Sequence, residues 1–123
     1  MSEHDTQCAF VTWCAWNESK HPELRLGFAV PNGGPRNIIT AKKLKAEGVR
    51  SGVPDYCLPV HRGGYIALWI EFKFGKNKLS PAQTDYIERL KSHRHCVAVC
   101  YSVDEAISAV EGYLNPKHVM ATY

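Results

Sequence analysis

The strongest constraint on the fold is a mostly apolar segment that reads as a β-strand and has two charged residues near its end. In a strand over residues 65–74, alternate side chains point to opposite faces. One face carries Ile66, Leu68, Ile70 and Phe72, and the other carries Ala67, Trp69, Glu71 and Lys73. The first face is predicted to be core. The two charges on the second face indicate an ion pair or a metal site, because burying charge costs free energy unless it is paired or metal-bound.

A second strand-like segment, residues 53–60, is joined to the first by the short glycine-rich stretch His61-Arg62-Gly63-Gly64, which is typical of a hairpin turn. In an antiparallel hairpin centred on Gly63, Asp55 lies opposite Glu71. Two carboxylates so placed, with Cβ atoms roughly 4.5–5.5 Å apart, repel each other unless a cation lies between them. Oxygen ligands favour Mg²⁺ or Mn²⁺ over zinc. A salt bridge between Glu71 and Lys73 on an edge strand is the alternative.

The remaining pattern predicts a mixed α/β domain. Capping boxes that begin at Ser2, Ser80 and Ser102, and a glycine at position 48, mark helix ends. Helices are expected at residues 3–16, 38–47, 81–92 and 103–114, and strands at residues 24–30, 53–60, 65–74 and 96–101. The tail after Pro116 is expected to be loosely held. This order predicts one mixed sheet flanked by helices.

Composition narrows the class of protein. A chain of 123 residues is the length of one domain, so we expect a single domain over residues 1–123. No apolar stretch is long enough to span a bilayer, and the start lacks the pattern of a secretory signal, so a cytoplasmic location is expected. Five cysteines without a paired spacing are expected to be free thiols. A net charge of +3 permits a nucleic-acid partner without requiring one.

Pro54-Asp55, followed by Glu71-Phe72-Lys73, resembles the signature of the PD-(D/E)xK nuclease superfamily. The surrounding sequence resembles the virus-type replication-repair nuclease (VRR-NUC) family, and its small stand-alone phage members in particular. The segments that carry this resemblance are residues 48–55, Ile70-Glu71-Phe72-Lys73, Ser80-Pro81-Ala82-Gln83, Asn32-Gly33-Gly34-Pro35-Arg36 and the lysine-rich helix before Gly48. The similarity runs over residues 3–114. It implies a restriction-endonuclease-like core, a mixed central sheet flanked by helices.

The resemblance also implies a DNA endonuclease that depends on Mg²⁺ or Mn²⁺. Asp55 and Glu71 would hold the metal with the backbone carbonyl of Phe72, and Lys73 would activate the water and stabilise developing charge. The resemblance implies a further acidic metal ligand on the first helix, which corresponds to Glu3, with Asp5 as the alternative.

Gln83 matches the glutamine of the family's following helix and could reach the attacking water or a phosphate. It also occupies the third helical position of a capping box, where its side chain would bond the Ser80 backbone. Both roles remain open from the sequence.

Several residues are candidates for contacts to the DNA backbone. Asn32, Gly33 and Arg36 could meet a phosphate, although Asn-Gly-Gly is also an ordinary turn sequence. The basic residues near the site in sequence are Lys42, Lys43, Lys45, Arg50, Arg62, Lys76 and Lys78. For the three lysines of the helix, a solvated face is an equally good interpretation.

The phage relatives resemble resolvases, which implies a homodimer that cuts branched DNA, Holliday junctions in particular, in the cytoplasm of a host cell. The alternatives are a nuclease for flaps, nicks or any DNA, a DNA-binding module without activity, and a structural domain with a buried ion-pair network. A zinc site at His93, His95, Cys96 and Cys100 is disfavoured because the spacing matches no zinc-finger pattern.

Overall fold

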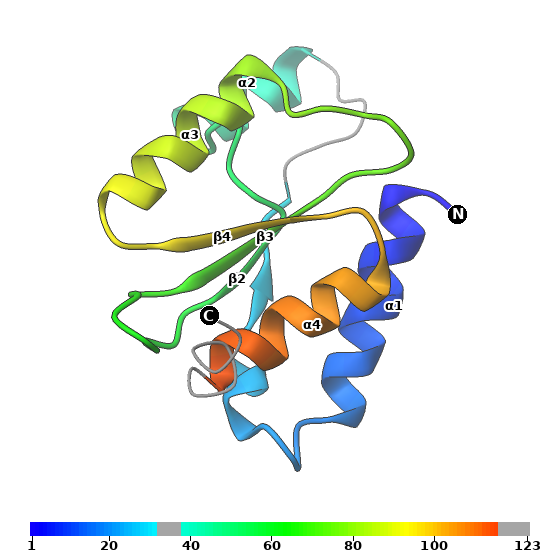
Figure 1. Cartoon of the computed structure of the whole chain (residues 1–123). Coiled ribbons are helices and arrows are strands. Elements are labelled where there is room, and N and C mark those ends of the chain that lie inside the picture. The colour runs from blue at the N-terminus through cyan, green and yellow to red at the C-terminus, as the bar shows by residue number, and fades with distance from the viewer. Residues whose placement is uncertain (32–37, 116–123) are drawn as a thin grey trace.

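The computed structural model describes residues 1–31 and 38–115. In chain order, its elements are α1 (Glu3–Trp16), the 3₁₀ helix η1 (Pro22–Leu26), β1 (Phe28–Ala29), α2 (Ile38–Ala46), β2 (Tyr56–Leu58), β3 (Leu68–Phe72), α3 (Pro81–Ser92), β4 (Cys96–Cys100) and α4 (Val103–Leu114). Figure 1 shows the sheet between helices, with α1 and α4 on one side and α3 and α2 on the other. The predicted α/β class, a mixed sheet flanked by helices, is confirmed.

The four strands lie in the order β1-β2-β3-β4. The first three are antiparallel neighbours, whereas β3 and β4 run parallel and are connected through α3. Tyr56 pairs with Ile70 and Leu58 with Leu68, which is the predicted hairpin register. One step further along this register, Asp55 lies across from Glu71. Because β3 is an internal strand, the edge-strand interpretation of Glu71 and Lys73 is wrong.

The main core lies on the face of the sheet covered by α1 and α4. Phe10 of α1 is fully buried, and its ring packs edge-on against Tyr56 and at a tilt against Phe72, with centroids 5.1 and 5.7 Å apart. Leu68, Ile70 and Phe72 are buried as predicted, but Ile66 is 53% exposed. Ile66 is exposed because β3 starts at Leu68, so the strand predicted over residues 65–74 was three residues too long at this end.

The predicted strand over residues 24–30 is largely wrong. Pro22 stands at the start of η1, and i to i+3 hydrogen bonds (Leu24 N to His21 O, Gly27 N to Leu24 O) close a 3₁₀ turn where alternation had indicated extended chain. Only Phe28 and Ala29 remain as strand. The alternating apolar residues that indicated a strand are Leu24, Leu26, Phe28 and Val30, and of these Leu24 alone is buried. A two-residue strand cannot bury one whole face of an alternating pattern.

The predicted helices are confirmed to within one residue. Ser2 and Ser80 form complete capping boxes with Asp5 and Gln83. At α4 the box is half formed, because the Glu105 carboxylate accepts from the Tyr101 N–H and not from the cap residue. Helix α2 buries none of its residues and makes no close backbone contact with another helix or strand of the described chain.

Two expectations from composition can be compared with the structure. All five cysteines are free thiols, as predicted, and Cys14, Cys57 and Cys100 are buried. Among the described residues, no helix has both the length and the apolar character needed to cross a membrane. The expectation about the tail after Pro116 falls outside the described residues.

Candidate active site

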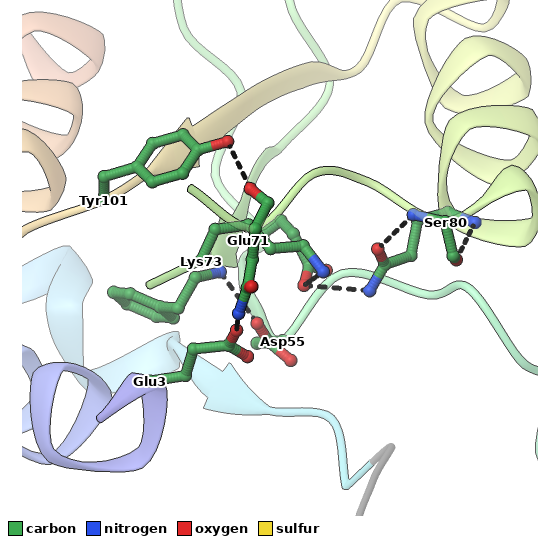
Figure 2. A network of polar contacts seen from close by, with 9 residues as sticks. Glu3, Asp55, Glu71, Lys73, Ser80 and Tyr101 are labelled. Carbon is green, nitrogen blue, oxygen red and sulfur yellow. Dashed lines mark hydrogen bonds and ion pairs between the residues drawn. The ribbon is translucent and has the colours of Figure 1, made fainter. Parts of the chain in front are cut away.

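Two carboxyl groups meet where β2 begins and β3 ends. Asp55 immediately precedes β2, and its Oδ2 accepts a hydrogen bond from the Phe72 backbone N–H at 2.8 Å. This bond ties Asp55 to the strand that carries Glu71, and the two carboxyl groups lie close enough for each to shift the pKa of the other. Figure 2 shows both side chains in one cluster with Lys73. The predicted hairpin register thus places both acids on the same face of the sheet.

Burial makes this pair electrostatically costly. Glu71 is only 2% exposed, and burial, followed by the charge of Asp55, raises its pKa to about 8. Burial also raises the pKa of Asp55, although the Phe72 N–H bond opposes that effect. Glu71 Oε1 is buried and has no hydrogen-bond partner among the described residues. Buried polar atoms are rarely left in that state, so this oxygen indicates a position for a cation.

Lys73 and Gln83 flank the other oxygen of Glu71. Lys73 Nζ lies 4.0 Å from Glu71 Oε2, and Gln83 Nε2 donates to the same oxygen at 3.1 Å. Gln83 Oε1 also accepts from the Ser80 backbone N–H at 2.9 Å. The capping role of Gln83 is therefore confirmed, and the other end of its amide contacts Glu71, whereas contact with the attacking water or a phosphate stays a prediction.

The donor atoms fit a hard divalent ion. Carboxylate oxygens from Asp55 and Glu71, with the backbone of Phe72 beside them, are the ligand type that Mg²⁺ and Mn²⁺ prefer. Over residues 1–31 and 38–115, no three or more His, Cys, Asp or Glu side chains are grouped so that they could hold a metal together. A pair of carboxylates nevertheless suits Mg²⁺, which usually keeps several waters and takes one or two carboxylates.

The disfavoured zinc site is not formed. His95 and Cys96 belong to no metal-binding group of the described chain. His95 Nδ1 instead faces the indole Nε1 of Trp69 at 3.0 Å, in the geometry of a hydrogen bond donated by the tryptophan.

The first-helix carboxylate at this site is Glu3. Its side chain is partly buried, accepts a hydrogen bond from Asn77 Nδ2 at 3.3 Å, and is near enough to raise the pKa of both Asp55 and Glu71. Asp5 is exposed and its Oδ2 accepts from the Ser2 N–H. Glu3 is thus beside the acidic pair, whereas Asp5 is used for helix capping.

The predicted DNA-contact residues that the structure describes lie in several separate places. Asn32, Gly33 and Arg36 lie outside the described residues. Lys42 is exposed on α2, while Lys45 and Arg50 line a groove between α2 and α3 together with Tyr86 and Arg89. Lys76 and Lys78 are exposed on the loop after Lys73. Arg62 forms an ion pair with Glu23 instead.

Three residues near the site were not singled out from the sequence: Gly52, Asn77 and Tyr101. Gly52 has φ +86°, and a Cβ at this position would lie 2.4 Å from the Ala82 carbonyl oxygen, so only glycine lets the chain pass the first turn of α3 on its way to Asp55. Its sequence signal, Ser51-Gly52, is that of any turn. No local sequence pattern indicates a role for Asn77 or Tyr101, because both residues contact segments that are distant in the sequence.

A mixed sheet with this acidic pair and adjacent lysine defines the class of protein, a nuclease of the PD-(D/E)xK type. Comparison with protein families matches the VRR-NUC domain over residues 1–104. A solved structure named as a VRR_NUC domain protein is similar over 93% of this chain and 88% of that one, with 29% sequence identity and a TM-score of 0.73. A search of curated proteins found no match. The chain belongs to the VRR-NUC family, which confirms the resemblance inferred from the motifs.

Proposed function

We propose that this nuclease hydrolyses DNA phosphodiester bonds with Mg²⁺ or Mn²⁺ held by Asp55 and Glu71. The single observation that carries the proposal is the buried pair itself, with Glu71 Oε1 unpartnered among the described residues. A divalent cation supplies the missing charge, and it accounts for two acids buried side by side better than a structural role does.

The surrounding residues have distinct roles in this scheme. A bound ion would polarise the phosphate and lower the pKa of a water molecule. The Phe72 N–H orients Asp55, and Gln83 orients Glu71 by its bond to Oε2. Lys73, only 9% exposed, holds its ammonium beside Glu71, where it can donate to the attacking water and stabilise charge on the phosphate. The Phe72 carbonyl would complete the protein ligands.

We propose that the substrate is branched DNA, with the four-way junction first among candidates. Lys42, Lys45 and Arg50, together with Asn32, Gly33 and Arg36, would contact phosphates. The support for a junction is the resemblance to phage resolvases, because symmetric cutting requires two active sites and a twofold homodimer supplies both. We also propose that residues 1–123 form one domain, since α1 and α4, from opposite ends of the chain, pack on the same core.

Cleavage of matched synthetic substrates tests this proposal. We expect four-way junctions to be cut in Mg²⁺ or Mn²⁺ but not in EDTA, with flap, nicked and linear duplexes cut more slowly. Asp55→Asn should abolish cutting, and Lys73→Ala should lower turnover by about 100-fold or more while retaining metal binding. Arg25→Ala is the control, because Arg25 pairs with Glu18 and is not among the candidates for DNA contacts.

Each result of this assay has a defined meaning. Equal cutting of all branched and linear substrates would reject junction preference and keep the nuclease. No cutting by the wild type, with DNA binding intact, would favour the DNA-binding module without activity. Full activity of Asp55→Asn would defeat the metal assignment.

A further inference from the structure

A chain of hydrogen bonds links the end of β4 to the start of α1 across the loop that follows Lys73. Tyr101 Oη donates to the backbone oxygen of Asn77 at 2.9 Å, and Asn77 Nδ2 donates to Glu3 Oε2 at 3.3 Å (Figure 2). These bonds join three segments that are far apart in sequence. They converge beside Asp55 and Glu71.

Asn77 fixes a side chain that would otherwise be free to rotate. Glu3 is in the first turn of α1, and the helix cap is completed by Ser2 and Asp5 without it. Within the described residues, Asn77 gives the Glu3 carboxylate its hydrogen bond. Ordering a glutamate side chain has an entropic cost, so a carboxylate held in advance assists cation binding more than a mobile one.

Asn77 is itself held by Tyr101, which is in turn bonded to the start of α4. Tyr101 directly follows β4, and its backbone N–H donates to the Glu105 carboxylate in the first turn of α4 at 2.9 Å. Through Tyr101, the corner between β4 and α4 therefore sets the position of the exposed loop. Through Asn77, the loop sets the position of Glu3.

We propose that Asn77 and Tyr101 are positioning residues that hold the Glu3 carboxylate at the edge of the Asp55–Glu71 pair. There Glu3 strengthens divalent-cation binding by its charge, without joining the two carboxylates that bind the ion directly. This inference rests on the proposed function, because it assumes that the pair binds a cation.

The test is Mn²⁺ binding without DNA, measured by isothermal titration calorimetry. Asn77→Ala should weaken the affinity by roughly three- to tenfold, the effect of one hydrogen bond. Tyr101→Phe, which removes one hydroxyl, should weaken it in the same direction. Tyr65→Phe, at an exposed tyrosine on the hairpin turn, should bind Mn²⁺ as the wild type does.

The decisive comparison repeats Asn77→Ala in a Glu3→Gln background, where it should have no further effect. Thermal unfolding in EDTA reports any general loss of stability, which would weaken binding in both backgrounds alike. Unchanged affinity in Asn77→Ala, or equal weakening in both backgrounds, would overturn the inference and keep the metal site. Failure of the wild type to bind Mn²⁺, or binding that survives Asp55→Asn, would overturn the proposed function and this inference with it.

Discussion

Glu71 is a carboxyl group in an environment that disfavours its charge. It lies near two further acidic groups, Asp55 and Glu3, and receives one amide hydrogen bond and one ammonium contact at 4.0 Å. Counting formal charges, three carboxylates face one lysine, so full ionisation leaves an excess of two negative charges. A bound divalent ion would neutralise that excess. Without the ion, the repulsion should lower the free energy of unfolding.

Without divalent ions, the free energy of unfolding should fall as pH rises from about 4.5 to about 8. Unfolded Glu71 ionises near its ordinary pKa of 4.5, whereas folded Glu71 keeps its proton up to about 8, so deprotonation favours unfolding across this window. Glu71→Gln should remove this part of the slope and raise stability at pH 8 by about 1 to 3 kcal/mol.

Urea unfolding in EDTA at pH 5 and pH 8 measures this effect. Glu88→Gln, at an exposed glutamate of α3, is the matched control and should follow the wild type. A Glu71→Gln variant that shows the wild-type pH dependence would contradict the expected burial cost.

At this scale, the sequence predicted contacts within the hairpin and missed those that cross the fold. The pairing of Asp55 with Glu71 follows from strand alternation and the position of Gly63, both of which are local properties. The Asn77 contacts join residues 74 and 24 positions apart, and no periodicity encodes such distances. Glu3 was preferred to Asp5 by resemblance alone, while the structure explains the choice through the capping box of Ser2.

The first turn of α3 contacts both chain segments that carry the acidic residues. Its capping box orients Gln83 toward Glu71, and its Ala82 carbonyl lies against Gly52, three residues before Asp55. Both acidic residues are therefore positioned by the same helix end.

Gly52→Ala should destabilise the protein by about 2 kcal/mol or more, because the new methyl group collides with the Ala82 backbone in addition to the strain at positive φ. Gly48→Ala is the matched control: Gly48 has φ +102°, but a Cβ there would meet nothing within 4 Å, so only strain of about 1 kcal/mol is expected. Urea unfolding at pH 5 compares the two variants. Equal losses would show that the close approach to α3 contributes nothing.

Helices whose ends are marked by capping residues could be predicted from the sequence, whereas the short strand β1, which has no such marks, could not. Serine caps and a glycine at position 48 located the four helices because these residues satisfy or end the helix backbone. The alternation at Leu24 and Leu26 was misleading, since Pro22 favours a 3₁₀ turn whose residues also present apolar groups. Local sequence pattern could not separate a strand from a 3₁₀ turn, because the segment packs against α1 and β2, which lie elsewhere in the sequence.

The acidic pair and a group of basic residues lie in different parts of the molecule, and the groove that holds the basic residues also contains Asp85. The acidic pair is buried against the sheet, whereas Lys45 and Arg50 line the groove between α2 and α3. In the proposed function, a DNA backbone would lie along the groove while a metal ion binds at the acidic pair. Fold and family could be predicted from the residues of one chain, whereas the proposed dimer rests on the resemblance alone, because dimer formation depends on complementarity between surfaces that sequence patterns do not describe.

Replacing Lys45 and Arg50 together by alanine should lower the salt dependence of DNA binding. Each phosphate contact contributes about 0.9 to the slope of log affinity against log salt, so the slope should fall by about 2. Fluorescence anisotropy in EDTA, from low to moderate salt, measures it on the catalytically inactive Asp55→Asn protein. Lys20→Ala, at a lysine paired with Glu111, is the control. An unchanged slope would place the DNA path elsewhere.

Helix α2 has nine residues, and none of them is buried. Helices this short are marginal in water when packing does not support them. In the free protein, its amide hydrogens should therefore exchange with solvent far faster than those of α3, and they should become protected when a polyanion neutralises its lysines. Part of the binding free energy would then be spent on ordering this helix, so an oligonucleotide too short to reach α2 would avoid that cost.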